Sequence, residues 1–381
     1  MNNFQFQNPT KLIFGKGQIT NLATEIPLGK KILITFGGGS VKQNGVYDQV
    51  KEALKNHNCV EFWGIEPNPT VETLRKAIAL GKEKQIDFLL AVGGGSVLDG
   101  TKLVSAGIWN ENDAWDIVID PKALGKCVPY GSVLTLPATG SEMNQGAVIS
   151  NTETVEKKPF YSTFPTFSIL DPETTFSLPK FQIAVGIADT FMHVMEQYLT
   201  KTDESPLMDR WSEGILHTLI EITPKIQKNQ HDYDQMANFM FCATMALNRI
   251  ISMGVSQDWA THMIAHEITA LHNTTHGQAL TLVFPSLMRV MEEQKREKIL
   301  QMGARIWGIT TGSTEEKVNQ TIAKTEEFFR SLELATKLSE LNIGQDSIDK
   351  IVARFEATGQ VFGENGNITP DVVRQILELA K

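Results

Sequence analysis

Histidines cluster in one part of this chain at spacings that suit a divalent metal. Upstream of the cluster, Asp189 and His193 are four residues apart, so on a helix they share one face. Carboxylate and imidazole groups bind divalent metals, and a metal that polarises an oxygen atom points to an enzyme. Four of the 8 histidines of the chain lie within residues 257–278, namely His262, His266, His272 and His276.

The ligand set that these residues offer is one oxygen and three nitrogens. His262 and His266 are also four apart, and His276 follows a predicted break at residues 272–275 that would let it reach the same ion. The three cysteines are scattered and form no CxxC, which argues against thiolate ligands. The set suits Zn²⁺ or Fe²⁺, with Mn²⁺, Ni²⁺ or Co²⁺ also compatible. The HExxH motif of zincin proteases is absent, since residue 270 is not histidine.

Two GGGS turns, at residues 37–40 and 93–96, end predicted strands and open predicted helices. Glycine lets backbone N–H groups approach a phosphate, and a helix N-terminus adds partial positive charge. Two such turns after successive parallel strands predict nucleotide binding, although either alone is also compatible with an ordinary tight turn. The first turn lacks the acidic residue that an NAD site places on the ribose. Ser40 and Lys42 suit a 2′-phosphate, so NADP is favoured, unless Lys42 is only a solvated helix residue.

The elements that must position these groups change in character near residue 180. Strand-like and helix-like segments alternate before it, with a predicted helix at 41–57, and imply a parallel sheet with helices on both faces. Long segments of helical periodicity follow: 181–200, 206–228, 233–252, 256–272, 279–307, 314–340, 345–358 and 370–380. We therefore expect an α/β dinucleotide-binding domain, residues 1–179, and an all-helical metal-binding and catalytic domain, residues 180–381.

Composition excludes several classes of function for this chain of 381 residues. The net charge of −9 argues against a nucleic-acid-binding surface. No apolar run reaches the roughly 18 residues of a membrane span, and the N-terminal residues lack the layout of a signal peptide. Scattered cysteines suit a reducing compartment. We expect a cytoplasmic protein with neither a nucleic-acid nor a membrane partner.

A nucleotide-binding α/β half, a helical half and the Asp/His set together resemble the iron-containing (group III) alcohol dehydrogenase family. The resemblance covers essentially the whole chain and implies a Rossmann-like domain followed by an all-α domain, of the dehydroquinate synthase-like kind. Its most specific segments are LAVGGGSVLDGTK (90–102), TLPATGSEMN (135–144), GIADTFMHVMEQY (186–198) and DWATHMIAHEITALHNTTHGQAL (258–280). GGGSVK, QDWATHM and FGENGNIT (362–369) are similar to the YqhD-type branch of NADPH-dependent aldehyde reductases and butanol dehydrogenases. Residues 143–145 depart from that branch, which often has smaller side chains there.

Site residues follow from the resemblance position by position. The implied metal ligands are Asp189, His193, His262 and His276, with His266 lining the site without binding the metal. The implied cofactor contacts begin at the adenosine end, continue at the pyrophosphate turn and end with a nearby cation. They are Gly38, Gly39, Ser40, Gly94, Gly95, Ser96, Asp99, Thr135, Thr139 and Lys158, and we add Gly37, Lys42 and Ser141 as further candidates for cofactor contact.

The reaction that the resemblance implies is the reversible reduction of short- and medium-chain aldehydes by NADPH to primary alcohols. The metal would polarise the carbonyl oxygen, and the cofactor would supply the hydride. His266 is the candidate proton relay, because the pKa of a histidine suits the task. His272 is a second candidate, with a surface residue as the alternative. Asp99 would orient the nicotinamide end of the cofactor, or else cap or pair locally.

Other functions remain open at this point. Glycerol dehydrogenases and other polyol oxidoreductases share the architecture and a catalytic metal. A metallohydrolase would use the same ligands to activate water, and a non-catalytic nucleotide sensor would hold a structural metal. Members of the family are commonly dimers, and an exposed edge near residues 5–15 is a candidate for pairing in a homodimer.

Overall fold

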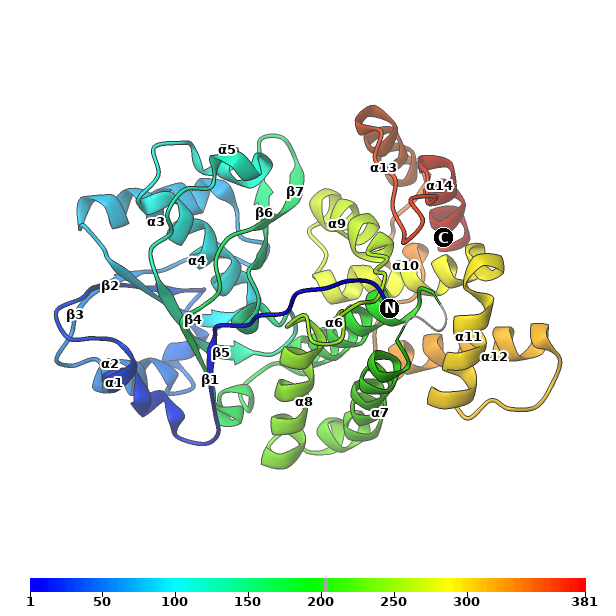
Figure 1. Cartoon of the computed structure of the whole chain (residues 1–381), viewed down its shortest axis with the longest axis horizontal. Coiled ribbons are helices and arrows are strands. Elements are labelled where there is room, and N and C mark those ends of the chain that lie inside the picture. Colours follow the sequence, from blue (N-terminus) through cyan, green and yellow to red (C-terminus); the bar gives the residue numbers. More distant parts are fainter. Residues whose placement is uncertain (202–204) are drawn as a thin grey trace. The chain divides into compact units, whose positions relative to one another are not determined.

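The computed structural model describes residues 1–201 and 205–381, and these divide into two compact units. The sheet unit comprises Gln7–Pro179 and Lys225–Asn248, and the helical unit comprises Met1–Phe6, Lys180–Pro224 and Arg249–Lys381. The elements of both are labelled in Figure 1. No helix in the described parts of the chain combines the length and the apolar character needed to cross a bilayer.

The sheet unit contains all the strands that the described residues form. The strands are β1 (Lys11–Phe14), β2 (Lys31–Phe36), β3 (Asn58–Phe62), β4 (Phe88–Gly94), β5 (Tyr130–Leu136), β6 (Gly146–Asn151), β7 (Glu156–Tyr161) and β8 (Phe167–Leu170). Its helices are α1 (Leu22–Glu25), α2 (Val46–Ala53), α3 (Val71–Glu83), α4 (Gly95–Ile108), α5 (Ala114–Ile119) and α8 (Tyr233–Ala246).

Six strands form a parallel sheet in the order β1-β8-β5-β4-β2-β3, which confirms the predicted α/β fold. β2 pairs with β3 on one side and with β4 on the other, so the strand order reverses direction between β2 and β4. In parallel α/β sheets, ligands bind beyond the carboxyl ends of the strands at such a reversal. The two GGGS turns follow β2 and β4 and therefore flank this point.

Helices cover both faces of the sheet, as the alternation of buried side chains along its strands requires. In β2, Ile32 and Ile34 belong to one apolar core and Leu33 to the other. Val50 of α2 packs in the first core and Leu74 of α3 in the second. The chain thus passes from one face to the other between α2 and α3, and Figure 1 shows these helices on opposite sides of the sheet.

One local prediction for this unit was wrong, and one pair of strands was not predicted. The helix expected over residues 41–57 is shorter: Ser40–Lys42 form a 3-10 turn, and α2 begins only at Val46. Gly45 separates the two pieces with a φ of 78°, a left-handed conformation that glycine adopts without strain. The sequence analysis also did not foresee the antiparallel hairpin of β6 and β7.

The helical unit is built from long helices, as predicted from the periodicity after residue 180. They are α6 (Lys180–Tyr198), α7 (Pro206–Lys228), α9 (Ala260–His272), α10 (His276–Val290), α11 (Glu292–Ile306), α12 (Thr314–Ser331), α13 (Gln345–Thr358) and α14 (Pro370–Leu379). The segment expected as one helix over 279–307 is two helices that meet at Met291. The helix expected over 314–340 ends at Ser331, and a 3-10 turn at Leu338–Leu341 follows.

We expected one domain over residues 1–179 and another over 180–381, and the two observed units differ from that division in two segments. Residues 225–248 belong to the sheet unit, because Met240 of α8 packs in a core of the sheet and Thr244 donates a hydrogen bond to Glu142. Residues 1–6 belong to the helical unit, where the backbone N–H of Asn2 donates to the carbonyl of Gly254 at 2.8 Å.

Candidate functional site

The expected metal ligands lie close together inside the helical unit. Asp189 Oδ1 is 3.9 Å from His193 Nε2, 3.9 Å from His262 Nε2 and 3.8 Å from His276 Nε2. One ligand atom each of Asp189, His262 and His276 lies within 4.8 Å of the other two. The ring of His193 stacks on that of His262, with 4.7 Å between centroids. Three imidazoles thus approach one carboxylate oxygen.

This donor set fits one divalent ion. Four ligands at about 2.1 Å from a tetrahedral ion lie roughly 3.4 Å from one another. The separations from Asp189 Oδ1, 3.8–3.9 Å, are close to that value, and the ligand atoms of Asp189, His262 and His276 all lie within 4.8 Å of one another, whereas His193 is outside that group of three. Asp189, His193 and His262 are each at least 95% buried, whereas His276 is 21% exposed in its side chain. A buried carboxylate and neutral imidazoles are the chemistry that Zn²⁺ or Fe²⁺ requires.

Three helices bring these residues together. Asp189 and His193 are one turn apart on α6, His262 lies in the first turn of α9, and His276 begins α10. The break between α9 and α10 comes at Asn273, whose φ of 51° ends α9. α10 then packs closely on α6 at Gly277, where a Cβ atom would lie 2.2 Å from the carbonyl oxygen of Val185. Glycine at this position therefore lets His276 approach Asp189.

A carboxylate that the sequence analysis missed orients one of the histidines. Glu196 Oε1 lies 2.8 Å from His262 Nδ1 and accepts a further hydrogen bond, at 2.9 Å, from the backbone N–H of His262. Glu196 is 3% exposed, and burial raises its pKa to about 7. A carboxylate that holds the second nitrogen of a ligand histidine fixes its tautomer and its direction. Glu196 follows Asp189 by seven residues, and that helical spacing was the signal for it.

The two proton-relay candidates lie in different surroundings. His266 is 5% exposed, and its ring centroid is 5.0 Å from that of His276. His272 is exposed at the end of α9, and its Nε2 lies 2.9 Å from Ser347 Oγ of α13. Burial lowers the pKa of His272. His266 is thus beside the histidine cluster, whereas His272 contacts Ser347 on α13.

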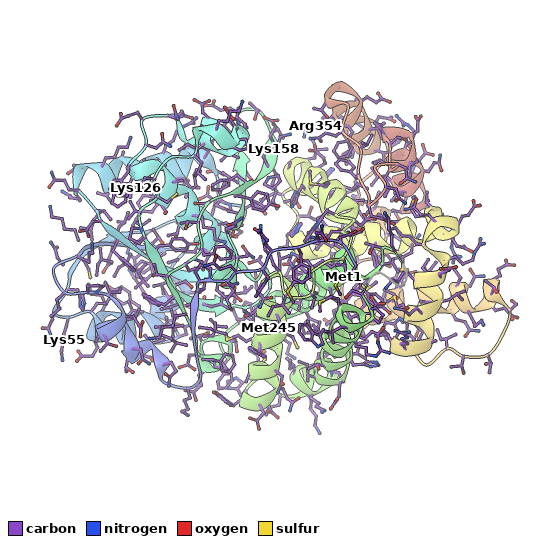
Figure 2. The ribbon with its side chains drawn as sticks, in the orientation of Figure 1. Met1, Lys55, Lys126, Lys158, Met245 and Arg354 are labelled. Atoms are coloured by element: carbon purple, nitrogen blue, oxygen red, sulfur yellow. The ribbon has the colours of Figure 1, made fainter. Side chains whose placement is uncertain are left out.

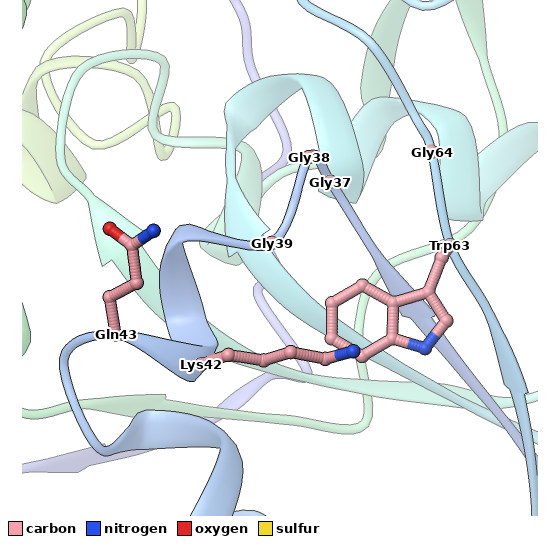
Figure 3. A pocket seen from close by; sticks show the side chains of 7 residues that line it. All are labelled: Gly37, Gly38, Gly39, Lys42, Gln43, Trp63 and Gly64. Carbon is pink, nitrogen blue, oxygen red and sulfur yellow. The ribbon is translucent and has the colours of Figure 1, made fainter.

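The first glycine turn lines a pocket of about 480 Å³ in the sheet unit. Four of the predicted cofactor residues, Gly37, Gly38, Gly39 and Lys42, are among its lining. Figure 3 shows these residues with the three that the sequence analysis missed, Gln43, Trp63 and Gly64. Ser40 is exposed in the 3-10 turn between Gly39 and Lys42.

Lys42 is held against an aromatic side chain of this pocket. Its Nζ lies 4.0 Å from the centroid of the Trp63 ring, toward which Figure 3 shows it directed. Phe36 stacks on the same ring with 4.0 Å between centroids and 12° between planes. Because Phe36 covers one face of the indole, the ammonium of Lys42 occupies the other. Trp63 Nε1 donates to Glu61 Oε2 at 2.9 Å, which fixes the indole in its plane.

The second glycine turn packs against the segment that follows β5. Gly94 is paired with Leu136, and a Cβ atom on Gly95 would lie 2.5 Å from Thr139 Oγ1. Glycine is therefore required for the start of α4 to approach Thr139. Ser96 lies in the first turn of α4, and Thr135 is 7% exposed in β5. The structure thus brings together the residues predicted for the second turn and for the TLPATGSE segment.

Asp99, predicted at the cofactor, lies in a hydrogen-bonded network of the sheet unit. Its Oδ1 accepts from Ser141 Oγ at 2.6 Å and its Oδ2 from the backbone N–H of Val148 at 2.9 Å. Lys102 Nζ donates to the same Ser141 hydroxyl at 2.6 Å and to the carbonyl of Gly146 at 2.6 Å. Burial raises the pKa of Asp99 and lowers that of Lys102 to about 8. These contacts favour a role for Asp99 in local hydrogen bonding over the other predicted role, orienting the nicotinamide end of the cofactor.

Lys158, the predicted cationic neighbour of the cofactor, lies on β7 (Figure 2). Its Nζ is 3.4 Å from Glu156 Oε1 on the same strand, and its side chain is 26% exposed. It is not among the residues that line the pocket of the first turn.

Models of one protein family match both halves of the chain. The model of the iron-containing alcohol dehydrogenase family matches residues 9–172, and that of the C-terminal part of the Fe-containing alcohol dehydrogenase family matches residues 183–380. The NADPH-dependent aldehyde reductase YqhD of Escherichia coli is 49% identical over 387 residues, which is 100% of both chains. The probable NADH-dependent butanol dehydrogenase 1 of Bacillus subtilis is 41% identical and covers 99% of each.

Solved structures agree with the sequence relatives. The crystal structure of Escherichia coli YqhD has a TM-score of 0.98 at 48% identity, covering 100% of this chain and 99% of that one. The NADH-dependent butanol dehydrogenase A of Thermotoga maritima has a TM-score of 0.94 at 35% identity, with 100% and 99% covered. Both family models, both relatives and both structures therefore point the same way: the chain belongs to the iron-containing alcohol dehydrogenase family.

Proposed function

We propose that this protein catalyses the reversible reduction of short- and medium-chain aldehydes to primary alcohols, with NADPH as the hydride donor. The observation that carries the proposal is the approach of three buried or half-buried imidazoles to Asp189 Oδ1, at 3.8–3.9 Å. The relatives support the reaction, since one is named an aldehyde reductase and another a butanol dehydrogenase. The substrate of this chain is accordingly a small aldehyde or alcohol.

Asp189, His193, His262 and His276 would hold the metal, which is Zn²⁺ or Fe²⁺ by the chemistry of the set. A divalent metal there would supply Lewis-acid polarisation of the carbonyl oxygen of the aldehyde. The chain itself contributes a dry and fixed environment, because Asp189 is 3% exposed and Glu196 orients His262. His266, buried beside His276, would deliver the proton that the product oxygen needs.

NADPH would bind at the carboxyl ends of β2 and β4. The glycine turns after these strands would admit the phosphates to backbone N–H groups. The relatives named above differ in cofactor, so the choice of NADPH depends on the pocket itself. The described residues that line it include Lys42 and no acidic side chain. A lysine suits a 2′-phosphate, whereas an acidic residue would suit the free hydroxyl of NAD.

The state of the protein in the cell is also part of the proposal. We propose a cytoplasmic homodimer, because the three cysteines are free and β1 is the outermost strand of the sheet. An outermost strand offers unpaired backbone groups to a second copy of the chain. Sedimentation at micromolar concentration would test the dimer, and a monomer there would contradict it.

The proposed function is tested by butyraldehyde-dependent oxidation of NADPH and of NADH, measured side by side. We expect turnover with NADPH that is lost on chelation and restored by Zn²⁺ or Fe²⁺ alone. Turnover that survives complete removal of metal would contradict the proposed site. Absence of turnover with either cofactor, in protein shown to contain metal, would contradict the proposed substrate class.

A further inference from the structure

The segment FGENGNIT, residues 362–369, carries a buried carboxylate that the proposed function does not use. The segment connects α13 to α14 and closes on itself, since the backbone N–H groups of Phe362 and Ile368 each donate to the carbonyl of the other at 3.0 Å. Between them, the side chain of Glu364 is turned inward and is 1% exposed. Gln294 Nε2 on α11 donates to its Oε1 at 2.7 Å.

Glu364 and Asp258 share a single buried lysine. Lys295 Nζ lies 2.8 Å from Glu364 Oε2 and 2.6 Å from Asp258 Oδ2, and it also donates to the carbonyl of Leu199 at 2.9 Å. The side chains of Lys295 and Asp258 are 1% and 4% exposed. Burial raises the pKa of Asp258, whereas the hydrogen bond with Asp258 and the charge of Lys295 outweigh burial and lower the pKa of Glu364. Lys295 thus joins the two buried carboxylates, each of which lies within hydrogen-bond distance of its ammonium.

Asp258 in turn fixes the point at which α9 begins. Its Oδ1 accepts from the backbone N–H of Ala260 at 2.8 Å, and its own N–H donates to the carbonyl of Glu196 at 2.8 Å. The residue between, Trp259, has a φ of 65°, a left-handed conformation that is strained for a bulky side chain. Such a conformation persists only where surrounding contacts hold it. His262 follows Trp259 by three residues and is hydrogen-bonded to the side chain of Glu196.

A continuous set of contacts thus runs from the loop 362–369 to a histidine of the proposed metal site. We propose that Glu364, acting through Lys295 and Asp258, is a positioning residue for His262, so that its loss speeds the release of the metal. This inference depends on the proposed function, because it takes Asp189, His193, His262 and His276 as the residues that hold the metal.

The test is the rate at which metal passes from the Zn²⁺-loaded protein to a coloured chelator. We expect Glu364→Gln, which keeps the volume and removes the charge, to release metal about tenfold faster than the unmodified protein. Gln294→Ala removes one hydrogen bond to Glu364 and no charge, so it should release metal at an intermediate rate. Because Gln294→Ala leaves the buried ions in place, it keeps the inference testable if Glu364→Gln does not fold.

A matched control exists on the same helix. Lys298, three residues after Lys295 on α11, forms a buried ion pair with Asp209 at 2.6 Å, and the other carboxylate oxygen of Asp209 accepts a hydrogen bond from Gln301 on the same helix. Asp209→Asn should lower the temperature of unfolding of the metal-free protein about as much as Glu364→Gln does. Its rate of metal release should nevertheless equal that of the unmodified protein.

The outcomes separate the inference from the proposed function. If Asp209→Asn speeds release as much as Glu364→Gln, or if neither Glu364→Gln nor Gln294→Ala changes the rate, the positioning role is wrong while the metal site stands. If the unmodified protein turns over aldehyde and retains no metal, the proposed metal site is wrong, and if it holds metal but turns over no aldehyde with either cofactor, the proposed substrate class is wrong. Faster release confined to Glu364→Gln and Gln294→Ala supports the inference.

Discussion

Glu196 Oε1 lies 2.8 Å from His262 Nδ1, while Nε2 of the same ring lies 3.9 Å from Asp189 Oδ1. In its ionised form Glu196 has no proton to donate, so Nδ1 of His262 then carries the hydrogen and Nε2 is left with its lone pair available on the side of Asp189. Glu196 and Asp189 are on the same face of α6, seven residues apart. One helix therefore supplies both a proposed metal ligand and the group that orients a second one.

Glu196→Gln tests this relationship. Glutamine fills the same volume but accepts the Nδ1 proton more weakly, so His262 becomes a poorer ligand. We expect the affinity for Zn²⁺ to fall by about 10–100-fold, as measured by competition with a chelator. Glu378→Gln, on the exposed face of α14, is the control and should bind metal as the unmodified protein does. Equal affinities for all three proteins would contradict the orienting role.

His262→Ala tests the ligand assignment itself. The variant lacks one of the four proposed ligands, and the site is buried, since Asp189 is 3% exposed. We therefore expect it to bind no metal and to reduce no aldehyde. NADPH binding, measured by fluorescence titration, should stay largely unchanged, because the glycine turns are in the sheet unit. A variant that keeps full metal occupancy and full turnover would show that the ligand set is wrong.

His266→Ala and His272→Ala distinguish the two relay candidates. His266 is buried beside His276, so we expect its loss to lower kcat by about 100-fold while the metal content stays the same. His272 is exposed and bonded to Ser347, so its loss should leave the rate unchanged. The pH profile of kcat is the second measurement, since loss of a relay also removes its ionisation from the profile. The reverse order of effects would assign the relay to His272.

Lys42→Met tests the cofactor preference. We expect the Kd for NADPH to rise by about tenfold or more, because a charged hydrogen bond to the 2′-phosphate is lost, while the Kd for NADH is unchanged. Trp63→Leu leaves the charge but removes the ring that holds it, a contact worth about 0.5–1 kcal/mol, so it should lower the preference by only a few fold. Lys55→Met, on the exposed surface in Figure 2, is the control for charge alone. Parallel losses for both cofactors would contradict a 2′-phosphate role for Lys42.

The spacing of residues in the sequence was enough to predict the histidine cluster, but it was not enough to predict all the residues that line the pocket. Asp189, His193 and His262 are found by helical spacing, because the turn of a helix repeats locally. Trp63 was missed because it follows β3, and it reaches Lys42 only through the lateral pairing of β2 with β3. Single-sequence periodicity carries no information on such pairing. Glu196 has a local signal, but a glutamate in a helix is ordinarily exposed, and only its 3% exposure singles it out.

The two-part architecture was also predictable from local sequence patterns. The placement of α8 and the break at Gly45 were not, and each has a physical cause. Buried parallel strands and long helical periods identified both halves of the chain. Helical periodicity reports which face of α8 is apolar, yet it cannot report that Met240 packs in a core of the sheet. The break at Gly45 depends on one residue in a left-handed conformation, which the helical pattern of residues 41–57 concealed.

We expect Lys102 to make the stability of the sheet unit depend on pH. It is fully buried, and burial lowers its pKa to about 8, whereas the pKa of an exposed lysine is about 10.4. Between these values the unfolded chain binds a proton that the folded chain has lost, so the free energy of unfolding rises with pH through this window. The rise attributable to this residue is at most about 3 kcal/mol, complete above the unfolded pKa and absent below the folded one.

Lys102→Met removes this dependence together with the hydrogen bonds to Ser141 and Gly146. We therefore expect the variant to be less stable overall but to lack the part of the rise between pH 8 and pH 10 that the unmodified protein owes to Lys102. Urea unfolding at pH 8 and pH 10 measures both the free energy of unfolding and its change with pH. Lys55→Met, which removes an exposed lysine, should show the same increase in the free energy of unfolding as the unmodified protein. Parallel curves for the unmodified protein and Lys102→Met would show that Lys102 keeps its proton in the folded chain, held by the nearby carboxylate of Asp99.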